Sequence, residues 1–131
     1  MIIGESMAQT KKEKLDQVLA KFMQVGQISA AGIVSTEGLL ITSIMPPDMN
    51  ERIVGALCST IIASAQTASS QMGTGEVAEV NVKTEHGVLL LKPSGEKALF
   101  FALAQVEAQL GLITVEIEIR AKQVQEILEE V

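Results

Sequence analysis

Aromatic side chains are scarce in this sequence, which has three phenylalanines and neither tryptophan nor tyrosine among its 131 residues. The hydrophobic core is therefore expected to be mostly aliphatic. Proteins that bind nucleic acids need basic surfaces for the phosphate backbone and often stack bases on aromatic rings. This chain instead has a formal net charge of −6. We therefore expect no nucleic-acid partner.

Cysteine is almost absent as well, because Cys58 is the single one and has no partner for an internal disulfide. The first residues also lack the basic segment, apolar run and cleavage site of a signal peptide. These two absences predict a protein of the reducing cytoplasm. No histidine or aspartate lies near Cys58 in the sequence to activate it, so a buried structural thiol is the favoured interpretation.

Motifs for catalysis and for cofactor binding are missing too. Residues 73–76 (GTGE) lack the lysine and the spacing of a phosphate-binding loop, so the chain is not expected to be a GTPase itself. His86 is the only histidine and falls in a predicted turn, where no second histidine or cysteine can complete a metal site. We predict no catalytic, cofactor-binding or metal-binding residues and no enzymatic activity.

The length and composition are those of one globular domain. Hydrophobic residues make up 47% of the chain and charged residues 20%, which is typical of a folded protein. Residues 1–9 show no hydrophobic period and are expected to be a flexible N-terminus. Residues 10–131 are expected to form a single domain with its own core.

Helical patterns lie near both ends of the chain. Thr10 and Glu13 form a capping box, and the apolar stripe behind them predicts a helix that ends before Gly26. Residues 112–120 match both a helical stripe and a strand-like alternation. The strongly helical residues that follow favour a helix from about residue 112, with a strand as the alternative.

Five runs of β-branched and large apolar residues predict strands. The first two form a hairpin around Gly38, and the last three form a meander with short turns. The strands are expected at residues 28–35, 39–44, 77–84, 88–92 and 98–104. With the helices included, the order α-β-β-α-β-β-β-α predicts an α+β fold, a five-stranded antiparallel sheet with helices on its faces.

The central helix has no charged residue between Ile53 and Gly75. It is expected to be capped by Asp48 or Asn50 and to end at Gly73 and Gly75. A surface helix normally carries lysines and glutamates on its solvent side, so their absence predicts that something covers this helix. Its many hydroxyl and amide side chains make it a poor membrane span, and we expect no membrane insertion.

The two sides of this helix differ in side-chain size. At about 100° per residue, the side expected to pack on the sheet collects Ile53, Val54, Leu57, Ile61, Ala65, Ala68 and Met72. The opposite side collects Gly55, Ser59, Ile62, Gln66, Ser69 and Ser70. We predict that this second side contacts another copy of the chain, with the two helices antiparallel about a two-fold axis. Burial inside a larger monomeric core is the alternative.

Four stretches of the sequence, in this order, resemble the roadblock / dynein light chain family in its prokaryotic branch. They are AAGIVSTEGLLITS, MGTGEVAEVNV, HGVLLLKPSGEKALFFALA and AQLGLITVEIEIRA. The resemblance covers the chain from about Lys11 to Val131. Family members often carry a more charged second helix, so the uncharged helix here is a departure.

The resemblance implies a roadblock, profilin-like fold and a module that is not an enzyme. It implies a homodimer that joins two sheets edge to edge and packs the two second helices together. The strand at the joining edge would contain Glu79, Val80, Asn81 and Val82. The family also implies a partner, a small Ras-like GTPase whose nucleotide cycle or location the dimer controls.

The sequence leaves three functions to compare. The first is a GTPase-regulating dimer, and the second is a structural adaptor that bridges a larger complex regardless of nucleotide. A small-molecule sensor or enzyme has less support, because few polar or titratable groups converge. Of the two arginines, Arg52 lies in the first turn of the uncharged helix, where it could contact a partner, although a solvated surface charge is the favoured interpretation. We expect any effect on a GTPase to act through that protein's own switch regions.

Overall fold

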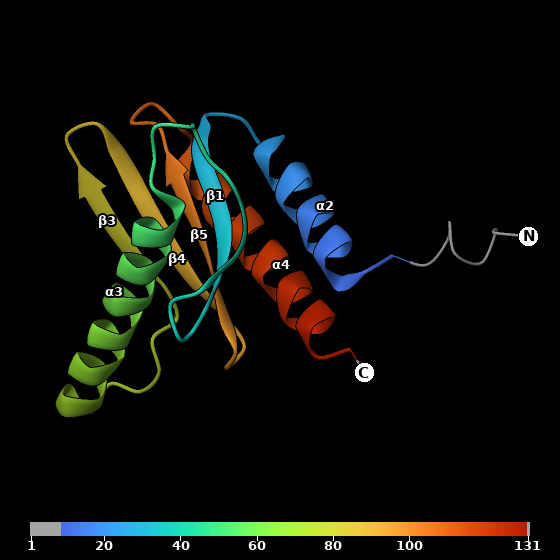
Figure 1. Ribbon diagram of the computed structural model, residues 1–131. Helices are drawn as coiled ribbons and strands as arrows, with labels where there is room; N and C mark the ends of the chain where they lie inside the picture. Colours follow the sequence, from blue (N-terminus) through green and yellow to red (C-terminus); the bar gives the residue numbers. More distant parts are fainter. Residues whose placement is uncertain (1–8, 131) are drawn as a thin grey trace, which may run out of the picture.

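The computed structural model describes residues 9–130 and shows a sheet with helices on both faces (Figure 1). The elements are α2 (Lys11–Met23), β1 (Ile28–Ser35), β2 (Leu40–Ile44), α3 (Glu51–Met72), β3 (Val80–Thr84), β4 (Gly87–Ser94), β5 (Ala98–Ala104) and α4 (Leu110–Leu128). This is the predicted order of helices and strands. The predicted fold class is therefore confirmed.

The sheet has the strand order β2-β1-β5-β4-β3, and all of its neighbouring strands are antiparallel. Strands β2 and β3 are consequently the two edges. Helices α2 and α4 lie side by side on one face, whereas α3 crosses the other face by itself (Figure 1). The three layers are thus a helix pair, the sheet and a single helix.

Each face of the sheet has its own hydrophobic core. On the face covered by α2 and α4, the ring of Phe100 meets that of Phe22 edge to face, with centroids 5.0 Å apart. The next residue, Phe101, packs with Cys58 in the smaller core under α3. Successive side chains of a strand point to opposite faces, so β5 supplies one phenylalanine to each core.

The helix ends follow the capping signals in the sequence. The hydroxyl of Thr10 accepts a hydrogen bond from the backbone N–H of Glu13 at 3.1 Å, and the Glu13 carboxylate accepts one from the Thr10 N–H at 3.2 Å. Of the two predicted caps for α3, Asn50 is the one used, because its side chain accepts from the Ile53 N–H at 3.1 Å. Gly73 ends α3 in the left-handed conformation, with a φ of 69°.

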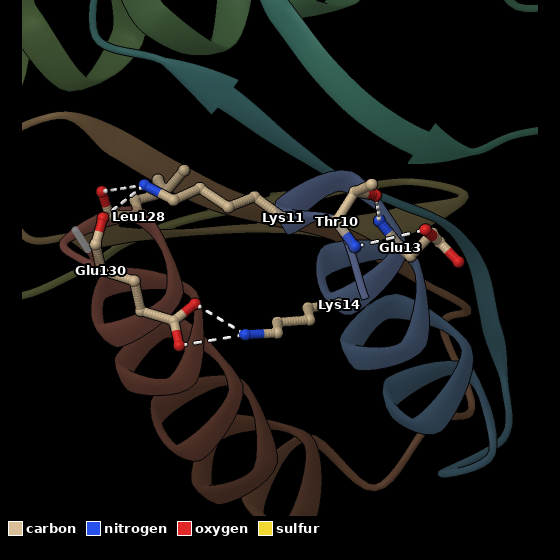
Figure 2. Close-up of polar contacts among 6 residues, drawn as sticks. All are labelled: Thr10, Lys11, Glu13, Lys14, Leu128 and Glu130. Atoms are coloured by element: carbon tan, nitrogen blue, oxygen red, sulfur yellow. Dashed lines mark hydrogen bonds and ion pairs between the residues drawn. The ribbon is translucent and has the colours of Figure 1, made fainter. Parts of the chain in front are cut away.

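Two lysines of α2 hold the C-terminal end of α4 (Figure 2). The ammonium group of Lys11 donates to the carbonyl oxygens of Leu128, at 3.4 Å, and Glu130, at 2.6 Å. Lys14 forms an ion pair with the Glu130 carboxylate at 3.0 Å. The last carbonyls of a helix carry partial negative charge, so cations are favoured there. This contact joins the start of the first helix to the end of the last.

Three local expectations have different outcomes. The region 112–120 lies within α4, which confirms the helix and rejects the strand alternative. Strand β3 begins at Val80 rather than at Val77, because the Val77 N–H donates to the Gln66 side chain on α3 instead of to a neighbouring strand. The predicted flexible end, residues 1–9, lies outside the described residues except for Gln9, as does Val131.

Gly32 provides a test of the packing beneath α3. A Cβ atom at this position would lie 2.4 Å from the ring of Phe101. We predict that Gly32→Ala destabilises the protein by about 1–3 kcal/mol, because the buried ring cannot move aside without strain. Urea unfolding measures the change.

The matched control is Gly111→Ala, because a Cβ at Gly111, in the first turn of α4, meets nothing within 4 Å. This variant should be neutral or stabilised by up to about 1 kcal/mol, since alanine favours helix over glycine. Equal free energies of unfolding for the two variants would contradict the proposed packing of Phe101.

Candidate protein interface

Small residues let the inner side of α3 lie close to its own β1–β2 hairpin. Gly55 is buried, and a Cβ there would lie 3.4 Å from the Gly38 carbonyl oxygen. One turn later, the Ser59 hydroxyl donates to the Thr36 carbonyl oxygen at 2.9 Å. The chain after α3 is held on the same side, where Gln66 accepts from the Val77 N–H at 3.1 Å. The inner side of α3 is therefore fixed by backbone contacts as well as by apolar packing.

These contacts correct the predicted orientation of α3. Of the six residues expected to face a second copy, only Ser70 is exposed; the others, Gly55, Ser59, Ile62, Gln66 and Ser69, are buried or half-buried in their own protomer. Several residues expected on the sheet are exposed instead, namely Ile53, Leu57, Ala68 and Met72. The hydrophobic period could not identify the buried side of α3, because neither side carries a charge that would mark it as exposed. Contact with the hairpin backbone occurs at Gly55 and Ser59, which are small enough to allow it.

The outer face of α3 is consequently exposed and lacks any charge. Its three large members are Ile53, Leu57 and Met72, whose exposed fractions are 54%, 56% and 70%. We define the outer face as these residues together with Ala56, Thr60, Ala63, Ser64, Thr67, Ala68 and Gln71, all of them exposed. A face without charge that exposes large apolar side chains on a folded domain is typical of a protein interface.

An apolar groove borders this face, between α3 and the sheet. It encloses about 270 Å³ and is lined by Ala30, Met49, Val54, Leu57, Cys58, Ile61, Leu89, Phe101 and Leu103. No lining residue is charged or carries a hydroxyl or amide side chain. The thiol of Cys58 is buried, and this burial raises its pKa to about 11. The thiol is therefore protonated at neutral pH and adds no charge to the groove.

Strand β3 is an edge of the sheet with one unpaired side. It pairs with β4 along one side, and no strand of residues 9–130 pairs with its other side. Of the predicted edge residues, Val80, Asn81 and Val82 lie in the strand, whereas Glu79 precedes it and accepts from the Asn81 side chain at 3.1 Å. An unpaired edge presents backbone donors and acceptors to a second strand.

The remaining polar candidates do not converge on a reaction site. Arg52 is exposed and lines a surface hollow with Leu39 and Glu51, whereas Arg120 is paired with Glu116 at 2.6 Å on α4. His86 lies in an exposed turn, as predicted. Within residues 9–130, no three histidine, cysteine, aspartate or glutamate side chains gather in a way that could hold a metal ion.

By length and composition, α3 is also the one helix of the described chain that could cross a membrane, with a mean hydropathy of 1.3 over its most apolar window. On its inner side, however, the Ser59 hydroxyl donates a hydrogen bond to the backbone of the β1–β2 hairpin, and apolar side chains pack on the sheet. These contacts make α3 part of the domain's own fold.

Comparison with known families adds to this geometry. A family model described as the Roadblock/LC7 domain matches residues 14–104. The chain belongs to the Roadblock/LC7 family. The match includes α3 and all five strands, which are the elements that form the exposed face, the groove and the free edge. The resemblance to this family seen in the sequence is thereby confirmed.

Relatives of this Roadblock/LC7 chain occur in archaea and bacteria. An uncharacterized protein of Methanocaldococcus jannaschii is 26% identical over 110 residues, which cover 84% of this chain and 96% of the relative. A solved structure of MglB with a tetrameric arrangement has a TM-score of 0.86 at 18% identity, covering 94% of this chain and 93% of that one. A Roadblock/LC7 domain from Streptomyces avermitilis has a TM-score of 0.82 at 21% identity, covering 88% and 98%. At these identities the structures establish a shared fold.

In this Roadblock/LC7 chain, the raised pKa of the Cys58 thiol predicts a loss of stability at high pH. Its pKa is raised from an ordinary value of 9.0 to about 11, so the folded state keeps a proton that the unfolded state loses. Stability is therefore full below pH 9 and falls as the pH rises toward 11. The loss should reach about 2–3 kcal/mol.

The measurement is urea unfolding between pH 8 and pH 11, compared with Cys58→Ala. All other residues are the same in the two proteins, so the difference in slope isolates the thiol. Parallel pH profiles for the two proteins would show that the thiol is not sheltered from water.

Proposed function

We propose that this protein is a non-catalytic homodimer that regulates or holds a small Ras-like GTPase in the cytoplasm. The observation that carries the proposal is the uncharged outer face of α3, which is exposed beside an apolar groove. A second copy supplies a matching surface, because a two-fold axis brings the same patch of each protomer together. The two α3 helices then run antiparallel.

Burial of this face provides the driving force for dimerisation. Covering a large apolar side chain completely contributes about 1.5–3 kcal/mol, and Ile53, Leu57 and Met72 are each more than half exposed. Pairing of the two β3 edges, around Val80, Asn81 and Val82, adds backbone hydrogen bonds and removes an unpaired edge from solvent. In this arrangement two five-stranded sheets become continuous.

Family membership supports the GTPase partner. The prokaryotic branch that the sequence resembles partners small Ras-like GTPases, and no phosphate-binding loop or converging catalytic group is evident in residues 9–130 to suggest a reaction of its own. Arg52 is exposed at the start of α3. We assign it a contact role, and the effect on nucleotide hydrolysis is proposed to act through the switch regions of the GTPase.

Ala63 lies in the middle of the outer face and tests the homodimer. We predict that the wild type is a dimer by light scattering at micromolar concentration and that Ala63→Glu is a monomer. The exposed position admits glutamate in the monomer, whereas the dimer would have to bury an unpaired charge. Gln105→Glu, at an exposed position after β5, is the matched control and should remain dimeric. A monomeric wild type would refute the homodimer.

The dependence of GTPase binding on the bound nucleotide distinguishes a GTPase regulator from a structural adaptor. Small Ras-like GTPases from the same genome are purified, loaded with a GTP analogue or with GDP, and titrated against the wild-type dimer by calorimetry. We expect tighter binding to one nucleotide state, by about ten-fold or more, as befits a switch of about 1–3 kcal/mol. Equal affinity for both states would favour the structural adaptor, and no binding to any of them would reject a GTPase partner.

A further inference from the structure

The apolar groove beside α3 offers almost no hydrogen-bonding partner. Its lining side chains are hydrocarbon except for Met49 and Cys58, whose sulfur atoms form only weak hydrogen bonds. The backbone of Leu89, Phe101 and Leu103 is already used, because each of them lies in a strand that is paired on both sides. The α3 backbone is bonded within its own helix. A polar atom that enters the groove therefore loses its hydrogen bonds to water without replacement.

The same lack of polar partners disfavours water in the groove. A well-held water makes about two to four hydrogen bonds, whereas an apolar cavity stays dry and takes up apolar molecules. Covering the apolar walls with hydrocarbon removes them from contact with water, which is favourable. The chemistry of the walls thus selects a hydrocarbon.

Polypeptide backbone and charged ligands do not suit this groove. Each residue of a peptide would bring a backbone N–H and C=O into the groove, where neither is satisfied. A charged group finds no counter-charge, because no lining residue is charged and α3 has no charge between Ile53 and Gly75. The remaining class of ligand is a neutral small molecule made mostly of carbon and hydrogen.

The volume of the groove sets the size of that molecule. A cavity of about 150 Å³ lined by leucine, isoleucine and phenylalanine binds benzene, which has six carbon atoms. In proportion, the volume of about 270 Å³ found here accommodates roughly ten or eleven carbon atoms.

We propose that the groove is a binding site for a neutral, hydrocarbon-like small molecule of about ten carbon atoms. This inference goes beyond the proposed function and requires neither the homodimer nor the GTPase. The ligand contacts the buried side chains of Phe101 and Cys58, which belong to the smaller core, and the half-exposed Leu57 of α3. Because these residues come from both α3 and the sheet, the bound ligand joins the helix more firmly to the sheet.

Naphthalene is the probe for this site, because it is neutral, fluorescent and of about the expected size. We expect saturable binding to the whole chain at one site per protomer in fluorescence titrations, together with a higher unfolding temperature. The matched ligand is 1,5-naphthyridine, which has the same shape but carries two ring nitrogens that accept hydrogen bonds. Its dissociation constant should be higher by about ten-fold or more, because the groove leaves these acceptors without partners.

Substitution of Ala30 tests the location of the site, since Ala30 lines the groove from β1. The longer side chain of Ala30→Leu should fill part of the groove and weaken naphthalene binding by about ten-fold or more. Ala63→Leu is the matched control, because it adds the same side chain at an exposed position of α3 that does not line the groove. It should leave the dissociation constant nearly unchanged.

Methyl NMR of the wild type locates the site without any substitution. Ring currents of the bound naphthalene should shift the methyl signals of Met49, Leu57 and Ile61, which line the groove. The methyl signals of Leu112 and Val115 are the internal control, because these side chains are also exposed and apolar but belong to α4 on the other face of the sheet (Figure 1). They should not move.

The outcomes distinguish this inference from the proposed function. Saturable binding that is weakened by Ala30→Leu and shifts the groove methyls supports the site, even if the wild type is a monomer. No saturable binding, equal binding of naphthalene and 1,5-naphthyridine, or shifts confined to α4 would overturn it. Binding to the Ala63→Glu variant but not to the wild type would also overturn it, since a second copy would then fill the groove.

Discussion

Both faces of the sheet are apolar, but the fold provides two helices for one face and a single helix for the other. Five strands about 4.8 Å apart span about 20 Å, which two helices of about 10 Å diameter can cover. Helices α2 and α4 do so over the larger core. Helix α3 covers only part of the opposite face, and the groove lined by Leu89, Phe101 and Leu103 is the part that remains. The shortage of helical cover is the constraint from which the proposed dimer follows.

The sequence predicted the fold well wherever a local rule decided the outcome. The cap at Thr10, a cap for α3 at Asp48 or Asn50, a glycine at its end and the order of the elements along the chain all follow from rules that involve a few neighbouring residues. The choice of helix over strand at 112–120 was also decided locally, by the helical residues that follow. Family membership could be recognised because the four matching stretches occur in the family's order along the chain, and three of them lie within the matched residues 14–104.

The orientation of α3 could not be predicted from the same information. A hydrophobic period identifies a buried side only if the other side is polar and charged, and α3 lacks charge on both sides. Gly55 and Ser59 face inward because of their contacts with Gly38 and Thr36, which are distant in sequence. The late start of β3 has a similar cause, since the Gln66 side chain binds the Val77 backbone. Contacts between a helix and a loop backbone produce no hydrophobic period in the sequence, so the sequence alone does not predict them.

The lysine contacts at the end of α4 have a consequence for how the molecule can be joined to others. Lys14 and Glu130 are linked at 3.0 Å, so both ends of the described chain emerge together on the helix-pair layer (Figure 1, Figure 2). The outer face of α3 lies on the far side of the sheet. A tag, a fluorophore or an additional domain attached beside Gln9 or Glu130 would therefore start from the layer opposite the outer face of α3, which is the face proposed as the interface.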